Sequence, residues 1–180
     1  DQPFNFSMIT ADTHQEDGYV CNKCSNIYEE QYANVWKCAA SQLEEFLNWM
    51  KAQDFYDDTT VVILGEHCSM DSDFYNEITY DKHHGGTERK VYNCFMNSSV
   101  VPANQKNRKF TTMDMFPTIL ASLGCEIEGD RLGLGTNMFR VRLRSRGPVI
   151  NTLAEEYGYK NLFEELEKKS TFYNMELLYP

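Results

Sequence analysis

The stretch VVILGEH, residues 61–67, contains four consecutive β-branched or aliphatic residues that end at a glycine. A continuous apolar run of this kind is typical of a central parallel strand that is covered on both faces. Gly65 is expected to let the chain turn, so that Glu66 and His67 follow the strand at the edge of the sheet. A carboxylate and an imidazole held on a rigid strand end suit a divalent metal ion such as Mn, Zn or Mg.

The same pair has an ordinary alternative, in which Glu66 caps the following turn and His67 is a strand-end histidine that binds nothing. A metal site would also need one or two further ligands. The candidates that the chain could bring to this edge are Asp12, His14, Asp71, Asp73, His83 and His84.

The chain ahead of this stretch predicts a βαβ unit. Residues 8–14 suggest a short buried strand, and apolar residues between 27 and 53 recur at three- and four-residue steps, which predicts an amphipathic helix. A right-handed crossover would make strands 8–14 and 59–64 parallel. His14 would then lie at the edge where open α/β sheets bind their ligands. Alternatively, His14 is a turn residue held by backbone groups.

The rest of the chain predicts an α/β domain with a helical tail. After a long polar segment, we expect a strand at 91–97 and a helix at 114–123, with Pro117 in its first turn. Glycines at 133 and 135 lack the dinucleotide-binding spacing, so the loop 130–139 is interpreted as structural. Apolar residues in 151–169 predict two short helices broken at a glycine. We therefore divide the chain into a domain at 1–150 and a tail at 151–180 that packs on it.

Composition narrows the function classes. The chain has 180 residues, of which 42% are hydrophobic, and a formal net charge of -10. This length suits one domain with a real core. The negative charge repels phosphate backbones, which makes nucleic acid an unexpected partner, so a phosphate-bearing substrate would need a local cation. No apolar run reaches the roughly 20 residues that a membrane helix requires.

Six cysteines are scattered along the chain, and Cys21, Cys24 and Cys38 are the closest group. The CxxC spacing of the first two suggests zinc, but the second CxxC or histidine pair of a strong zinc motif is missing. A structural or redox-inert role is therefore favoured over a zinc site. A disulfide between two of the three stays open.

Four segments together resemble a known family. They are ITADTHQEDGYVC at 9–21, VVILGEHCSMD at 61–71, RKVYNCFMN at 89–97 and FTTMDMFPTILASLGCEIEGDRLGLGTNMF at 110–139. In that order they resemble the C-terminal half of a sulfatase-like domain of the alkaline phosphatase superfamily, closest to the phosphoglycerol transferase and lipoteichoic acid synthase branch. The resemblance implies a sulfatase-like sandwich with a largely parallel sheet flanked by helices and a small C-terminal α/β extension.

The resemblance also implies an activity. Such an enzyme is anchored in a bacterial cell membrane by upstream helices and has an extracellular catalytic domain. It moves glycerol phosphate from phosphatidylglycerol to a glycan or a teichoic acid chain through a phosphothreonine, with a divalent metal of the manganese type (Mg or Zn being alternatives). Other readings are a sulfatase or phosphoesterase, and a non-catalytic module that binds glycans or lipid headgroups.

Site residues follow from the resemblance position by position. Glu66 and His67 stand where the family has a metal-binding aspartate and histidine, so Glu66 is a departure by one methylene. His14 stands where a histidine contacts the glycerol phosphate or its leaving oxygen, a catalytic and substrate-binding role. Arg89 offers a forked phosphate contact, unless it is a plain surface charge. Because the nucleophile has no counterpart, we expect it upstream of Asp1 and expect this chain alone to be inactive.

Overall fold

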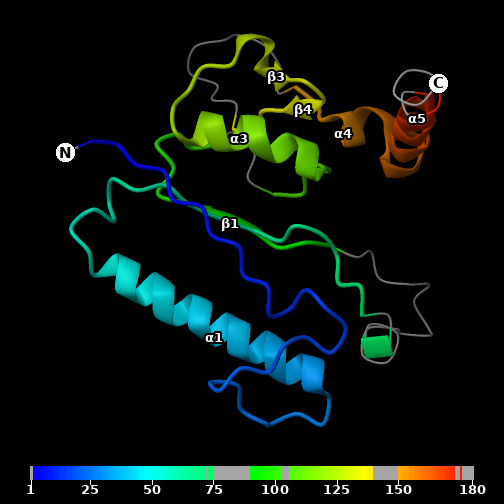
Figure 1. Cartoon of the computed structure of the whole chain (residues 1–180). Helices are drawn as coiled ribbons and strands as arrows, with labels where there is room; N and C mark the ends of the chain where they lie inside the picture. Colours follow the sequence, from blue (N-terminus) through cyan, green and yellow to red (C-terminus); the bar gives the residue numbers. More distant parts are fainter. Residues whose placement is uncertain are drawn as a thin grey trace. The chain divides into compact units, whose positions relative to one another are not determined.

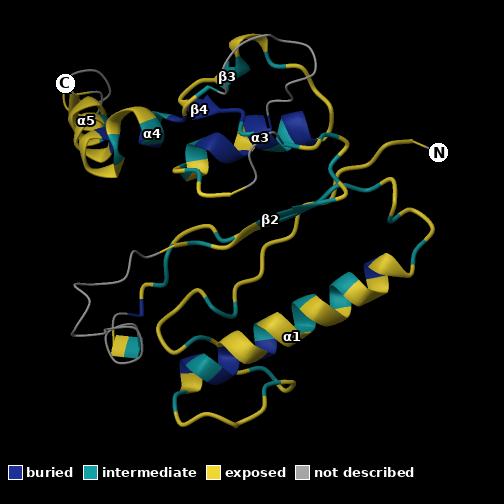
Figure 2. Cartoon of the chain, turned by 180° about the vertical axis from the view of Figure 1, so that it is seen from behind, coloured by how far each residue is buried: buried dark blue, intermediate teal, exposed yellow. Residues whose placement is uncertain are grey.

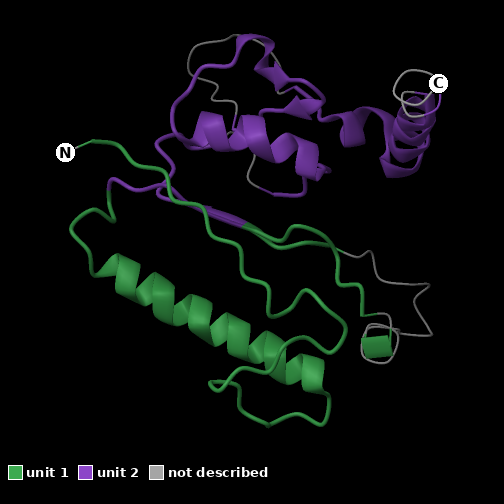
Figure 3. Ribbon diagram, viewed as in Figure 1, with its two compact units in different colours: residues 1–57, 64–93 green, residues 58–63, 94–180 purple. Residues whose placement is uncertain are grey.

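The computed structural model describes residues 2–71, 73–74, 90–102, 106–139, 150–172 and 175. The chain divides into two compact units, shown in Figure 3. Unit 1 contains residues 1–57 and 64–93, and unit 2 contains residues 58–63 and 94–180. The proposed boundary at residue 150 stays a prediction.

Unit 1 is built on one long helix, α1 (Gln31–Lys51), which Figure 1 labels. Its buried residues include Tyr32, Val35, Cys38 and Met50, and the opposite face is exposed, as Figure 2 shows. The apolar stripe read from the sequence therefore lies where an amphipathic helix requires it. The buried Asn34 holds the preceding loop, because its side-chain oxygen accepts the backbone N–H groups of residues 27 and 28 at 2.8 and 2.9 Å.

The predicted strand at 8–14 is wrong. Residues 2–11 have no regular secondary structure, and Ile9 is 93% exposed. An extended segment becomes a strand only when its backbone groups pair with a neighbouring strand, and 8–14 pairs with none of the described strands. The next residues turn instead: the Ala11 and Asp12 carbonyls accept N–H groups from His14 and Tyr19.

The strand in VVILGEH is confirmed, but its partner differs from the prediction. β1 (Val61–Leu64) pairs with β2 (Asn93–Met96). The Thr60 hydroxyl donates to Asn97 at 3.1 Å, and the Gly65 N–H donates to Tyr92 at 2.7 Å, so the two strands run antiparallel. The described strands form two sheets of two strands each. The α/β class is confirmed, whereas the largely parallel sheet and the sandwich are not.

Gly65 has a different role from the predicted one. A Cβ atom at this position would lie 3.1 Å from the Val91 Cβ and 3.2 Å from the Tyr92 nitrogen. Gly65 is therefore needed because the two chain segments approach closely, and no left-handed turn is involved.

Unit 2 packs α3 (Met115–Ser122) against a small hairpin of β3 (Arg131–Leu132) and β4 (Gly135–Thr136). The short 3-10 turns η1 (Thr112–Asp114) and η2 (Glu128–Asp130) precede α3 and β3. Buried Asp114 joins the parts, because its carboxylate accepts the N–H groups of Thr136 and Thr111, both at 2.8 Å. The predicted helix is confirmed; the loop 130–139 contains this hairpin, and its structural role stays a prediction.

The tail consists of α4 (Leu153–Tyr157) and α5 (Tyr159–Phe172), with a break at Gly158, where φ is +74°. Thr152 begins α4 with a capping box that involves Glu155. Glu155 also accepts two hydrogen bonds from Arg108, at 2.7 and 3.1 Å. The two predicted short helices are confirmed.

Candidate functional site

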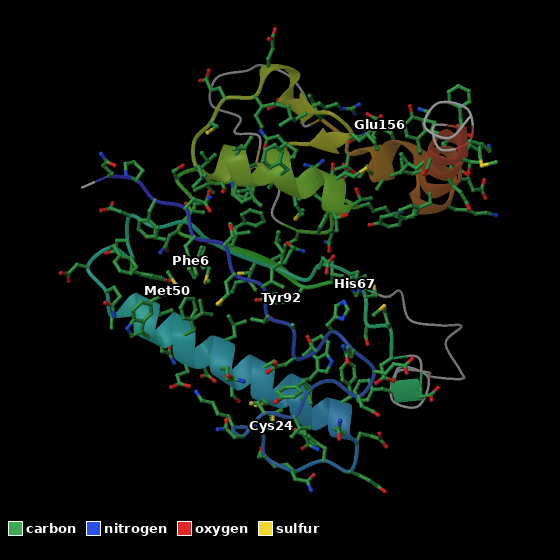
Figure 4. The ribbon with its side chains drawn as sticks, in the orientation of Figure 1. Phe6, Cys24, Met50, His67, Tyr92 and Glu156 are labelled. Carbon is green, nitrogen blue, oxygen red and sulfur yellow. The ribbon has the colours of Figure 1, made fainter. Side chains whose placement is uncertain are left out.

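β1 carries the chain directly to Glu66 and His67, and Figure 4 labels His67 just beyond the strand. Their side chains meet: His67 Nε2 lies 3.5 Å from Glu66 Oε2. His67 Nδ1 lies 2.8 Å from the Cys68 carbonyl oxygen, which can only accept a hydrogen bond, so Nδ1 is the protonated nitrogen. In the neutral ring, Nε2 therefore keeps its lone pair on the side of the carboxylate.

This donor set fits a divalent metal ion. A backbone carbonyl on Nδ1 is the usual partner that fixes the tautomer of a metal-binding histidine. Two ligand atoms bonded to one ion at about 2.1 Å lie roughly 3.4 Å apart in tetrahedral geometry. The observed 3.5 Å between Nε2 and Oε2 matches that spacing. The Glu66 side chain is 86% exposed and that of His67 41%, so both are open to solvent.

His14 lies next to this pair. Its ring and the His67 ring have centroids 5.7 Å apart in an edge-to-face arrangement. His14 lies on a turn, as the alternative interpretation predicted, because its backbone N–H donates to the Ala11 carbonyl at 3.0 Å. The turn nevertheless brings the imidazole beside that of His67, which in turn neighbours Glu66, and all three residues belong to unit 1. A parallel βαβ unit is not what gathers them.

A buried hydrogen-bond network holds the two segments together. The Tyr32 hydroxyl donates to the Thr13 carbonyl at 2.7 Å and lies 2.9 Å from the Ser69 hydroxyl. Asp71 is 5% exposed, and its two carboxylate oxygens accept the N–H groups of Asp17 at 2.9 Å and Phe74 at 3.0 Å. This network joins residues on both sides of His14 to residues just after His67.

Sequence reasoning missed this role. Asp71 was a candidate ligand, but both of its oxygens serve backbone donors. Nothing in the sequence around Asp71 indicates that its side chain accepts a hydrogen bond from the backbone N–H of Asp17, 54 positions away. Tyr32 lies at the start of the predicted helix, and its spacing gives no indication of the hydrogen bond to Thr13.

The other predicted residues are less informative. Asp12 is half-buried in the turn, and Asp73 is exposed. Arg89, His83 and His84 lie outside the described residues. Within the described ranges, the one trio of metal-binding side chains whose ligand atoms all lie within 4.8 Å of one another is Cys21, Cys24 and Cys38. Glu66 and His67 thus form a two-ligand pair with a histidine beside it.

The chain is similar to proteins named phosphoglycerol transferase I. It is 28% identical over 143 residues to the one from Salmonella choleraesuis (strain SC-B67). The aligned region covers 76% of this chain and 17% of that protein. The relatives from Salmonella paratyphi B and Salmonella newport are 30% identical over 77 residues, covering 39% of this chain and 10% of each. The chain thus spans less than a fifth of the length of these relatives.

No family model matches the chain, and the comparison with solved structures found no significant match. A contiguous match to 76% of the chain necessarily includes its middle, and therefore Glu66 and His67. Across the described residues, no helix combines the length and the apolar character needed to cross a membrane.

Proposed function

We propose that this chain is part of a metal-dependent phosphoglycerol transferase and that Glu66 and His67 supply two of the metal ligands. The observation that supports this most directly is the strand-end pair, with its fixed tautomer and its 3.5 Å spacing, inside a region similar to phosphoglycerol transferase I. The donor is phosphatidylglycerol, the acceptor is a glycan or a polyglycerol phosphate chain, and the intermediate is a phosphothreonine. The whole protein acts at the outer face of a bacterial cell membrane.

In this proposal each residue has a stated task. Manganese, when bound, would neutralise charge on the phosphoryl oxygens. Glu66 and His67 would hold the ion at the end of the strand, and the Cys68 carbonyl, which accepts a hydrogen bond from Nδ1, makes Nε2 the ligand atom of the neutral ring. His14, whose ring centroid lies 5.7 Å from that of His67, would hydrogen-bond an oxygen of the glycerol phosphate or of its leaving group. Arg89 would add a phosphate contact.

The test uses the full-length protein encoded by the gene, with manganese titration and release of diacylglycerol from phosphatidylglycerol as two separate measurements. We expect manganese binding and diacylglycerol release, both lost in Glu66→Ala. Glu66→Asp is the matched control, because it keeps the carboxylate and shortens it to the length expected from the family. Full release of diacylglycerol by Glu66→Ala would refute the assignment.

Other outcomes identify the alternatives. Hydrolysis of simple phosphate or sulfate esters, without any release of diacylglycerol, would support the sulfatase or phosphoesterase reading. If the full-length protein shows neither manganese binding nor turnover, the non-catalytic binding module is the interpretation that remains.

A further inference from the structure

A second cluster of metal-binding side chains lies in unit 1 and has no part in the proposed transfer. Cys21 and Cys24 come from the loop ahead of α1, and Cys38 comes from the buried face of the helix. Figure 4 labels Cys24 beside α1. The Cys21 sulfur lies 3.6 Å from that of Cys24 and 3.7 Å from that of Cys38.

These distances match the spacing of ligands around one ion. Sulfur atoms bonded to zinc at about 2.3 Å lie roughly 3.8 Å apart in a tetrahedral site. All three cysteines are free thiols, and their sulfur atoms lie within 4.8 Å of one another. A single ion can therefore reach all three with little movement of the backbone.

The surroundings shift the thiols in opposite directions, because the hydrogen bond with Cys24, followed by burial, raises the pKa of Cys38 to about 12, whereas N–H donors favour a thiolate at Cys21. A coordinated divalent cation deprotonates such a thiol. The Gln42 amide N–H group points at two of the sulfur atoms, 3.5 Å from that of Cys38 and 3.9 Å from that of Cys21. The backbone N–H of Lys23 donates to Cys21 and lowers the pKa of that thiol. Such N–H donors stabilise negative charge on sulfur, whereas apolar packing would not require them.

The cluster is also accessible. A pocket reaches Cys38, and its lining includes Lys23, Lys37, Gln42 and Glu45. Solvent or a small ligand can enter there and complete a tetrahedral site with three thiolates. Three thiolates and a divalent ion leave one negative charge; Lys37 lines the pocket, whereas Lys23 is paired with Glu45 at 3.5 Å.

We propose that Cys21, Cys24 and Cys38 bind one zinc ion, with the fourth position open to this pocket. Soft thiolates select zinc over manganese, whereas the Glu66 and His67 pair offers oxygen and nitrogen. The two sites thus sort two different metals. The zinc ion fastens the loop at 21–24 to α1, a structural role that is independent of the proposed transfer.

Cobalt substitution in the 180-residue chain, purified in reductant, tests this directly. We expect one equivalent of Co²⁺ to give intense visible d–d bands and a near-ultraviolet sulfur-to-cobalt charge-transfer band. One equivalent of Zn²⁺ should abolish both. In Cys38→Ser the apparent cobalt affinity should fall more than about 100-fold, since losing a direct ligand costs more than losing an outer partner.

Two control variants make the result specific. Cys125→Ser removes an exposed cysteine outside the cluster and should leave both bands unchanged. The double variant Glu66→Ala/His67→Ala should also keep them, which separates this site from the manganese site. Octahedral cobalt bands without charge transfer, or unchanged bands in Cys38→Ser, would overturn the proposal. The proposal would also be overturned if the chain purified without reductant had a mass 2 Da lower than the reduced chain and the reduced chain bound no cobalt. That result would indicate a disulfide in place of a metal site.

Discussion

Asp71→Asn is the sharpest test of how the candidate site is held together. The substitution keeps the size of the side chain, but one amide NH₂ must replace one carboxylate oxygen. The N–H of Asp17 or of Phe74 then faces another donor in a position where Asp71 is 5% exposed. A hydrogen bond to a charged group contributes about 1.5–3 kcal/mol, and the remaining bond to a neutral amide is weaker. We therefore expect a loss of about 2–4 kcal/mol.

Urea denaturation measures this loss as a lower midpoint with an unchanged slope. Asp73→Asn is the matched control, because it removes the same charge from a side chain that is exposed and lies two positions after Asp71. It should change stability by less than about 0.5 kcal/mol. A second measurement is the nuclear Overhauser effect between the His14 and His67 ring protons, whose centroids are 5.7 Å apart. We expect it to weaken in Asp71→Asn and to persist in Asp73→Asn.

Two results would refute the reasoning. Equal midpoints for Asp71→Asn and Asp73→Asn would show that the buried carboxylate contributes little. A large loss of stability with an unchanged histidine contact would show that Asp71 stabilises the fold without positioning the site.

In the full-length protein, His67→Ala should abolish manganese binding and transfer. It should shift the melting temperature little, because the His67 side chain is 41% exposed. If the variant still catalyses transfer in an assay on isolated membranes, His67 is not a metal ligand. Gly65→Ala should destabilise by about 1–3 kcal/mol in urea, since the new methyl group meets Tyr92 at 3.2 Å, and an unaffected midpoint would mean that the strands separate freely. The hydrogen bond from Arg108 lowers the pKa of Glu155 below its ordinary value of 4.5. The pair should therefore stabilise the folded chain fully at pH values above 4.5. This stabilisation should decrease as the pH falls through the lowered pKa. Glu155→Gln should cost about 1.5–3 kcal/mol at pH 7 and almost nothing in acid, and an equal cost at both pH values in urea titrations would exclude the ion pair as the cause.

Local patterns predicted the helices well. The stripe on α1 and the break at Gly158 depend on residues a few positions apart, so the sequence carries them directly. Strand pairing depends on distant segments. The apolar run at 61–64 revealed a strand, but nothing within it distinguishes an antiparallel partner at 93–96 from a parallel one at 8–14.

The candidate site was predicted in part, for a similar reason. The predicted proximity of His14 and His67 is found, with ring centroids 5.7 Å apart, whereas the roles given to Glu66, His67 and His14 by the resemblance stay predictions. The argument that a βαβ crossover would bring them together was wrong. The contacts that do so run from Tyr32 and Asp71 to backbone groups far along the chain, and backbone groups leave no trace in residue identity.

The division of the chain has a consequence for any attempt to dissect this protein. Residues 58–63 belong to one unit while the residues on both sides of them belong to the other, so the polypeptide passes between units three times. No single cut can release either unit intact. Truncation mapping would therefore produce two damaged halves, and only point substitutions can assign a property to one unit.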